Sequence, residues 1–327
     1  MNDLLEADHH LYNQGAIFAY DNELYFGTES DQYCDFRINA VTRDGKSINS
    51  KCYRKGPLPL NAHNSWQDRI KSSSFNDQRF IDDYNIAKDL IEAKQLNKAV
   101  IYNTYEIELD KPFNVFELSL LRKKIPHNTS LYGFWKEDQG LIGLSPELLF
   151  EKQENNSFKT CALAGTSLDE TELLGKANTN EEQQTVFNHF ESIFQKKNWL
   201  YQVSPKSTLS FGKLKHIHQE IVFHYYGKGD QLVSELAPTP AVGVFPSDKL
   251  KETWNNFNFN HLETPYAGTF HFESQSHDKA IVMIRALEWK KNIVSVHAGC
   301  GIVKDSILHE EIEESHNKIK TVLDYFK

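Results

Sequence analysis

Three charged residues near the C-terminal end of the chain fall on one face of a predicted helix. Glu311, Glu314 and Lys318 follow one another at steps of three and four residues, so at ~100° per residue they lie within about 60° of arc. Carboxylate oxygens suit a divalent metal ion, and an ammonium group suits an anionic substrate. The spacing therefore fits a metal site beside an anion site. The alternative is a solvated helix face with a Glu314–Lys318 ion pair.

A glycine-containing segment comes directly before this helix. Gly299 and Gly301 follow the strand-like residues Val294 and Val296, which predicts a strand, a glycine turn and then a helix over about residues 308–326. Because glycine lacks a Cβ, a ligand can come close to the backbone here and accept hydrogen bonds from its N–H groups.

The composition is that of a large globular protein. The chain has 327 residues, 39% of them hydrophobic, and a net charge of −9. The length is ample for a sizeable core, and the acidic balance argues against nucleic acid as a partner. No apolar run reaches the ~18 residues of a membrane span, and the first residues lack the apolar core of a signal peptide. We therefore expect a cytoplasmic protein whose four scattered cysteines are free thiols.

Strand-like segments alternate with a few helical ones along the chain. Residues 16–20 and 23–27 predict a hairpin, and residues 56–78 predict a loop or linker. Apolar residues at helical spacing predict a helix from about residue 80 to 97, and Thr179 opens a second helix. Further strands are expected at residues 98–107, 131–135, 141–144, 148–150, 158–163, 214–218, 266–272 and 280–286.

Several charged residues in these segments have two interpretations each. Glu147 follows a proline and precedes apolar residues, so it is either a desolvated general acid or a strand-end carboxylate in water. Arg285 is placed inside an apolar strand, where it pairs with a ligand carboxylate or a structural one. Glu182 stands three residues after Thr179, which is capping-box spacing and competes with a metal role. Lys98 at the start of a strand shows nothing by itself.

Taken in order, these segments resemble the chorismate-utilising enzymes: isochorismate synthase, salicylate synthase, and the synthase components for anthranilate and aminodeoxychorismate. The resemblance covers about residues 80–327. It is carried by the ordered set of residues 98–101, 145–149, 163–166, 181–182, 215–217, 238–241, 265–268, 284–285 and 298–303, with the three charged residues of the last helix.

The resemblance implies an α/β (α+β) fold of the anthranilate synthase component I type. Two large, mostly antiparallel sheets would pack face to face, with helices outside and the site between them. A single chorismate-binding domain would span residues 1–327, with a shortened strand-rich part at 1–75 and a catalytic part at 80–327.

The resemblance also implies roles for individual residues. One Mg²⁺ would be held by Glu182 and Glu314, with Glu311 close by. Members that add water use a lysine matching Lys98 as base and a glutamate matching Glu147 as acid. The positions implied to bind the substrate are Gly165, Thr166, His216, Thr239, Tyr266, Arg285, Gly299 and Lys318.

The residues at two positions indicate water as the nucleophile. Aminating members usually have Gln where this chain has Lys98, and some have Lys where it has Ala164. We therefore predict a Mg²⁺-dependent isochorismate synthase, an isomerase acting on chorismate for menaquinone or siderophore synthesis, without an amidotransferase subunit. The alternatives are a salicylate synthase, an aminating synthase, and a degenerate chorismate-binding protein without turnover. The last is suggested by departures from the family pattern at Asn103, Gln183, Ala237, Val244, Glu263 and His271.

Overall fold

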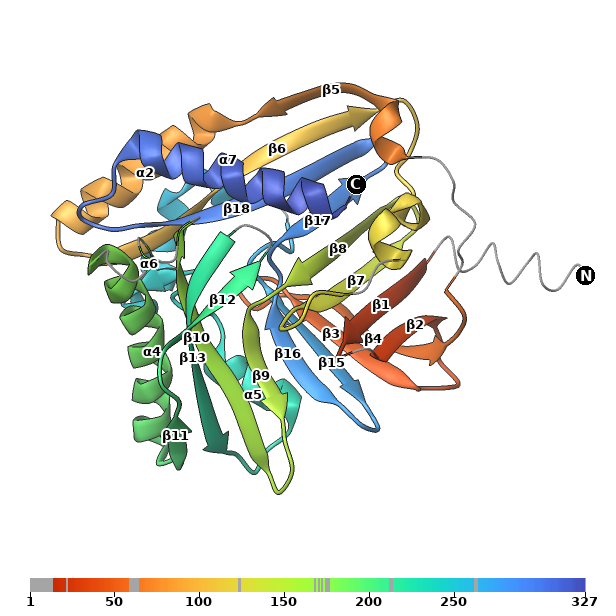
Figure 1. Cartoon of the computed structure of the whole chain (residues 1–327), viewed down its shortest axis with the longest axis horizontal. Helices are drawn as coiled ribbons and strands as arrows, with labels where there is room; N and C mark the ends of the chain where they lie inside the picture. The colour runs from red at the N-terminus through yellow and green to blue at the C-terminus, as the bar shows by residue number, and fades with distance from the viewer. Residues whose placement is uncertain are drawn as a thin grey trace, which may run out of the picture.

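The computed structural model describes residues 14–21, 23–58, 65–122, 125–167, 169, 171, 173, 177–211, 214–261 and 264–326. Its strands form one 18-stranded sheet (Figure 1). The strands are β1 (Gln14–Tyr20), β2 (Glu23–Glu29), β3 (Phe36–Val41), β4 (Ser47–Lys55), β5 (Ile70–Phe75), β6 (Lys98–Leu109), β7 (Ser130–Lys136), β8 (Gln139–Ser145), β9 (Leu148–Lys152), β10 (Ser157–Ser167), β11 (Tyr201–Val203), β12 (Ser207–Phe211), β13 (Leu214–His224), β14 (Val244–Phe245), β15 (Thr269–Ser274), β16 (Asp278–Val282), β17 (Ala286–Lys290) and β18 (Ile293–Ile302).

The sheet consists of two antiparallel arms. In the first arm, hydrogen-bonded neighbours run β6, β18, β17, β8, β7 and β1, with β5 and β14 beside β6. In the second arm they run β3, β15, β16, β9, β10 and β13, with β11 and β12 beside β13. Strands β2 and β4 join the arms. The predicted α/β fold with large antiparallel sheets is confirmed, and the two expected sheets are arms of one.

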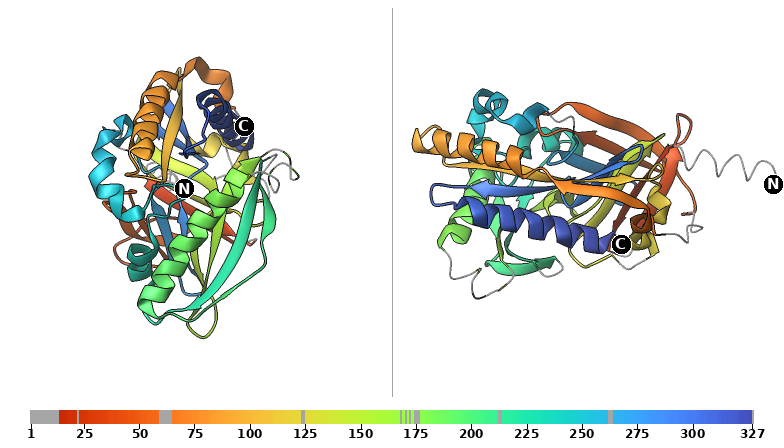
Figure 2. Two further views of the ribbon diagram at one scale, coloured as in Figure 1. Left: turned by 90° about the vertical axis from the view of Figure 1, so that its left-hand side faces the viewer. Right: turned by 90° about the horizontal axis from the view of Figure 1, so that it is seen from above.

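Helices cover the outer faces of the arms (Figures 1 and 2). The α-helices are α2 (Asp77–Glu92), α4 (Ala177–Lys197), α5 (Gly229–Leu236), α6 (Leu250–Thr253) and α7 (Leu308–Tyr325), and the 3-10 helices are η1 (Trp66–Arg69), η2 (Val115–Glu117), η3 (Ser119–Arg122), η4 (Ser247–Lys249), η5 (Trp254–Asn256) and η6 (Asn258–His261). Helices α2 and α7 pack on β6 and β18, and α4 packs on β10 and β13. Among the described helices, none is long and apolar enough to cross a membrane.

Two of the connections between the arms are crossovers that lie close together. At one the chain leaves the first arm between β8 and β9, and at the other it enters that arm between β16 and β17. The flanking strands pair on both sides, β8 with β17 in the first arm and β9 with β16 in the second. The N–H of Leu144 donates to the carbonyl of Arg285, and the N–H of Val282 donates to the carbonyl of Glu147, each at 3.0 Å. The two crossovers therefore lie side by side.

Three predicted elements differ from the structure. Residues 66–75 form η1 and β5 rather than a loop. Strand β5 is exposed and, among the described strands, pairs only with β6, so it lacks an alternating apolar pattern. Helix α2 ends at Glu92 rather than near Asn97, because Lys94 takes a left-handed backbone with φ 57°. Helix α4 begins at Ala177, so Thr179 is not its N-cap and the capping-box interpretation of Glu182 is wrong.

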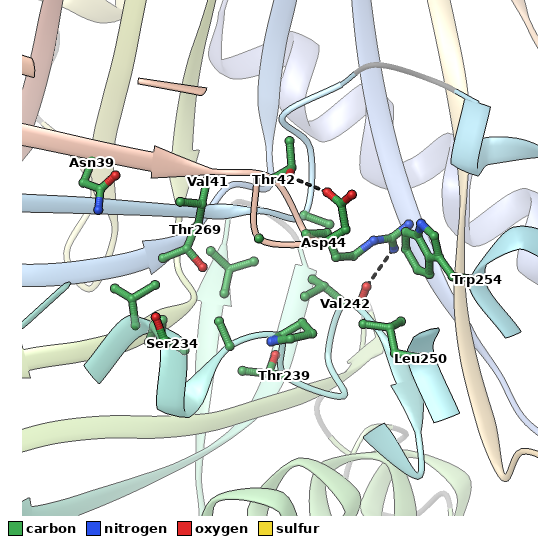
Figure 3. A pocket seen from close by; sticks show the side chains of 18 of the residues that line it. Asn39, Val41, Thr42, Asp44, Ser234, Thr239, Val242, Leu250, Trp254 and Thr269 are labelled. Carbon is green, nitrogen blue, oxygen red and sulfur yellow. Dashed lines mark hydrogen bonds between the residues drawn. The ribbon is translucent and has the colours of Figure 1, made fainter. Parts of the chain in front are cut away.

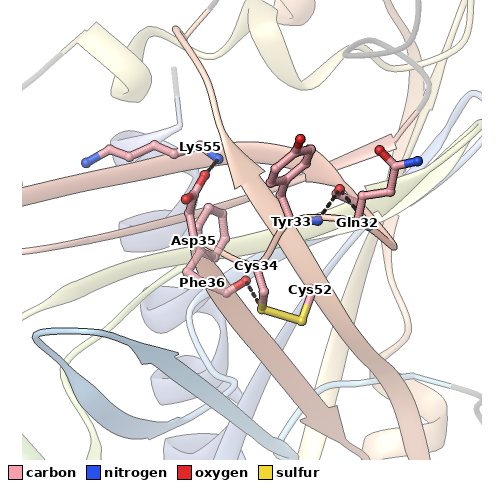
Figure 4. The surroundings of a disulfide bond; sticks show 8 residues. Gln32, Tyr33, Cys34, Asp35, Phe36, Cys52 and Lys55 are labelled. Carbon is pink, nitrogen blue, oxygen red and sulfur yellow. Dashed lines mark hydrogen bonds between the residues drawn. A yellow bond between two sulfur atoms is a disulfide. The ribbon is translucent and has the colours of Figure 1, made fainter.

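Two of the four cysteines are paired. Cys34 and Cys52 form a disulfide at the β3–β4 hairpin (Figure 4), so the prediction of four free thiols is wrong for them. Cys161 and Cys300 are free and buried. No sequence pattern indicated this pair, because 18 residues separate the two cysteines. Only the register of β3 with β4, which sets Arg37 opposite Cys52, brings them together.

The packing of α4 on the second arm can be tested by a substitution in the core between them. Phe194 is fully buried, and its ring stacks on that of Phe223 in β13 with centroids 4.7 Å apart. We expect Phe194→Ala to lower the free energy of unfolding by about 3–5 kcal/mol, measured by denaturant titration, because it removes a buried ring and leaves a cavity. Tyr226 is 84% exposed, so the control Tyr226→Ala should change the free energy of unfolding by less than about 0.5 kcal/mol. Equal losses in the two variants would contradict this packing.

Candidate active site

A cavity of about 80 Å³ lies where the two crossovers meet, with walls from both arms. Val100 and the end of β18 contribute from the first arm, and Leu163 contributes from the second. The cavity brings together seven of the residues that were predicted for the site: Glu147, Gly165, His216, Tyr266, Arg285, Gly299 and Lys318.

The crossovers place Glu147 and Arg285 at this cavity. Glu147 follows β8 and is 7% exposed, and Arg285 lies in the break between β16 and β17 with the same exposure. The prediction of Arg285 inside a strand is therefore wrong: β16 ends at Val282, and Arg285 itself has a left-handed backbone with φ 57°. Ala267, which also lines the cavity, has a φ of 63°. A left-handed backbone costs a non-glycine residue about 1–3 kcal/mol, and such strain gathers at functional sites.

Arg285 and His216 interact directly within the cavity wall. The guanidinium Nη2 lies 3.3 Å from Nε2 of His216, whose Nδ1 lies 3.1 Å from the carbonyl of Gly165. A guanidinium can only donate hydrogen bonds, so Nε2 of His216 accepts one from Arg285. The proton of the neutral imidazole is therefore on Nδ1, which donates to the carbonyl oxygen of Gly165. Burial, together with the charges of Arg285 and Lys318, lowers the pKa of His216 to about 3. His216 is therefore neutral, so it accepts this hydrogen bond without adding a second positive charge beside Arg285.

Gly299 is a glycine because neighbouring groups crowd its α-carbon. A Cβ there would lie 3.1 Å from Cγ1 of Val100 and 3.2 Å from the hydroxyl oxygen of Tyr266. Gly299 and Gly301 lie inside β18, paired with β6, so the predicted glycine turn is wrong. The N–H of Gly299 donates to the Tyr266 hydroxyl at 2.7 Å. That hydroxyl keeps its own proton, which it can donate to a ligand, and burial raises the pKa of Tyr266.

Lys318 connects α7 to the same glycine. Its Nζ donates to the carbonyl of Gly299 at 2.8 Å and lies 2.5 Å from Oε1 of Glu314. The predicted Glu314–Lys318 pair is thus present, and Lys318 also reaches the cavity. Burial opposes the charge of Lys318, but the nearby Glu314 outweighs it and raises the pKa of Lys318 above its ordinary value. Lys318 is therefore a second cation beside Arg285.

The two residues predicted as acid and base are both buried. Thr239 donates its hydroxyl to Oε1 of Glu147 at 3.2 Å, which orients that carboxyl group. Lys98 is 2% exposed and begins β6. Because side chains alternate along a strand, Lys98 lies on the same face of β6 as Val100, which lines the cavity. Lys98 itself is not in the lining of the cavity.

Three of the predicted metal and substrate positions are less fully defined. The side chains of Thr166 and Glu182 lie outside the described residues. Glu311 lies on α7 one turn before Glu314, and both carry the oxygen donors that Mg²⁺ prefers. Within the described part of the chain, no group of three or more His, Cys, Asp or Glu side chains could hold a metal ion.

His297 lines the cavity but was not predicted as a site residue. It is 6% exposed, its Nδ1 lies 2.8 Å from the hydroxyl of Thr104, and its Nε2 lies 3.4 Å from Glu288. In the sequence it resembled any polar residue of a strand. Only its place directly before Ala298 and Gly299 could have indicated a role at the site.

Comparison with known proteins identifies the family. A family model described as "Chorismate binding enzyme" matches residues 29–327. The chain belongs to the chorismate binding enzyme family. It is similar to isochorismate synthase MenF of Escherichia coli (strain K12), with 24% identity over 251 residues, which are 71% of this chain and 56% of that protein.

The fold is that of solved family members. A structure of MenF, the menaquinone-specific isochorismate synthase from Escherichia coli, matches with a TM-score of 0.79 and 17% identity, over 97% of this chain and 90% of that one. Anthranilate synthase component I from Streptococcus pneumoniae TIGR4 matches with a TM-score of 0.72 and 18% identity, over 94% and 89%. At such identities the structures show the fold. In sequence, the chain spans about half the length of the curated relatives it matches.

The neutral state of His216 can be tested by its effect on stability. Since its pKa falls from an ordinary value of ~6.5 to about 3 on folding, the unfolded chain takes up a proton in that pH range that the folded chain does not. Stability is therefore lost as the pH falls through this range, by up to about 1.4 kcal/mol for each pH unit. We expect the free energy of unfolding of His216→Gln to fall less than that of the unmodified protein between pH 6.5 and 4.

Denaturant titrations at a series of pH values measure this difference. His127→Gln, at an exposed histidine, is the matched control and should follow the unmodified protein. Parallel pH profiles for His216→Gln and the unmodified protein would show that folding leaves the pKa of His216 unchanged, which would contradict a neutral, buried His216.

Proposed function

We propose that this chain is a Mg²⁺-dependent isochorismate synthase, which adds water at C2 of the chorismate ring and expels the C4 hydroxyl. The observation that carries the proposal is a cavity lined by a buried glutamate and two cations, with a buried lysine on the face of β6 that borders it. Lys98 and Glu147 are 2% and 7% exposed, and Arg285 and Lys318 line the cavity. Family membership supports chorismate as the substrate.

The cations suit the two carboxylates of chorismate. Arg285 offers a planar set of N–H donors that can bind a carboxylate through two hydrogen bonds. Lys318 offers a point charge beside it, and the Tyr266 hydroxyl, which accepts from Gly299, can donate its own proton to a carboxylate. These groups would fix the ring relative to Lys98 and Glu147. Such positioning is a large part of enzymatic rate enhancement.

Proton transfer requires a base and an acid on the two sides of the ring. Lys98 would accept a proton from the attacking water as the new C2–O bond forms. Glu147 would give its proton to the C4 oxygen, so that the C4–O bond breaks and water leaves. Thr239, which donates to Oε1 of Glu147, would keep the carboxyl group in place during this step.

Mg²⁺ would be held by Glu182, Glu311 and Glu314, whose carboxylates have the donor chemistry that this ion prefers. When bound, it would neutralise a substrate carboxylate and draw negative charge towards it. Glu314, which also lies beside Lys318, would place the metal next to the substrate-binding cation. Menaquinone and siderophore synthesis remain the predicted uses of the product.

Substitution of Lys98 tests whether the nucleophile is water or ammonia. We expect the unmodified protein to form isochorismate from chorismate and Mg²⁺ without ammonia. Lys98→Ala should reduce this rate by about 10²–10⁴-fold, the typical contribution of a general base, and Glu147→Gln should do so because an amide cannot supply the proton. Product formation is followed by liquid chromatography. Lys111→Ala, at an exposed lysine, is the control and should form isochorismate at the rate of the unmodified protein.

The products also separate the alternatives. Salicylate with pyruvate would identify a salicylate synthase, and an amino product formed only with ammonia would identify an aminating synthase. Absence of any product from a folded, chorismate-binding protein would identify a binding protein without turnover. Each of these results, or a full rate in Lys98→Ala, would contradict the proposal.

The metal role can be tested on α7. Glu314→Gln removes one negative ligand while keeping the shape of the side chain, so it should weaken Mg²⁺ binding at least tenfold in isothermal titration calorimetry and raise the Mg²⁺ concentration needed for turnover. Glu313→Gln is the matched control, because Glu313 is exposed on the same helix. Equal Mg²⁺ affinities in the two variants would rule out Glu314 as a ligand.

A further inference from the structure

Arg43, in the turn between β3 and β4, is a buried cation without a carboxylate partner in the described chain. Its side chain is 7% exposed. The neighbouring carboxylates are engaged elsewhere: Asp44 pairs with Lys46 at 3.1 Å, and Asp83 accepts the backbone N–H groups of residues 258 and 259. Burial lowers the pKa of Arg43, but only to about 10, so it stays charged at neutral pH. A buried guanidinium normally has an anionic partner.

The contacts of Arg43 fix the plane of its guanidinium. The group lies over the ring of Trp254, 3.5 Å from its centroid, and Nη1 donates to the carbonyl of Val242 at 2.8 Å. The rings of Phe259 and Tyr102 are also close, with centroids 4.7 and 5.4 Å from the guanidinium carbon. A guanidinium that packs against aromatic rings binds an acceptor through the N–H groups at its edge, which is the geometry in which it binds a carboxylate.

Arg43 and Trp254 line a second cavity, of about 480 Å³ (Figure 3). This volume is within the range of small-molecule sites. Its walls are mainly apolar, with Val41, Leu149, Val233, Val242, Leu250 and Ala267 among the lining residues. Asp44 and Asp230 also line it, so a second negative charge on a ligand would be repelled.

We propose that this cavity binds a small monocarboxylate with an apolar ring, whose carboxylate pairs with Arg43. The apolar walls and the Trp254 ring would accept the ring of the ligand. The two aspartates would disfavour a dicarboxylate such as chorismate, so the site selects a different ligand from the one proposed for the active site.

The second cavity adjoins the candidate active site. Val242 and Ala267 line both cavities. Thr239 lines the second cavity, and its hydroxyl donates to Oε1 of Glu147 in the first. A ligand in the second cavity would therefore contact the residue that orients the proposed acid.

Isothermal titration calorimetry with sodium benzoate tests the proposal without depending on turnover. We expect benzoate to bind the full chain and Arg43→Gln to weaken that binding at least tenfold. Benzamide, which has the same ring without the charge, should bind at least tenfold more weakly than benzoate. Arg285→Gln removes the guanidinium of the active site and should leave the affinity for benzoate within twofold.

A second variant keeps the test valid if Arg43→Gln fails to fold, which thermal unfolding would reveal. Ser234 is exposed and lines the cavity, so Ser234→Trp should fill the cavity and weaken benzoate binding at least tenfold without disturbing the core. The proposal is overturned if benzoate does not bind, if benzamide binds equally well, or if Ser234→Trp keeps the affinity. Loss of binding in Arg285→Gln alone would assign benzoate to the active site and also overturn it.

Discussion

The hydrogen bonds between the two crossovers hold the candidate active site together. They join Leu144 to Arg285 and Val282 to Glu147 through backbone groups, and the hydroxyl of Ser145 adds a bond to the carbonyl of Val282 at 2.8 Å. Both arms of the sheet extend from this point. Glu147 and Arg285 are therefore attached to the same backbone that connects the arms. Moving one of these backbone segments relative to the other would break buried hydrogen bonds, which are costly to leave unmade.

The other groups of the site are set by close contact around Gly299. Its N–H, its carbonyl and the bare side of its α-carbon face Tyr266, Lys318 and Val100 respectively. A Cβ at this position would require the side chain of Val100 or the hydroxyl of Tyr266 to move by a few tenths of an ångström. The result is a compact site with two cations and a neutral histidine. Its charge suits an anionic ligand, and the backbone strain at Arg285 is consistent with a position retained for binding rather than for folding.

The sequence predicted those parts of the molecule that depend on local pattern. The stripe of apolar residues in α7 and the β-branched run in β6 were visible, and the motif order placed most of the site residues in one cavity. Features that depend on tertiary structure could not be predicted. Strand β5 carries no alternating pattern because it is exposed. Arg285 lies between two strands with a left-handed backbone, and the disulfide depends on strand register. His297 had no distinguishing pattern, because its partners come from distant segments.

The central claim is that the cavity activates water rather than ammonia. A reaction of the purified protein with chorismate and Mg²⁺ in water enriched in ¹⁸O tests it directly, with the product analysed by mass spectrometry. The account predicts isochorismate that carries one heavy oxygen in the new C2 hydroxyl, because that oxygen comes from solvent. Isochorismate without the label, or an unlabelled amino product formed only when ammonia is present, would contradict it.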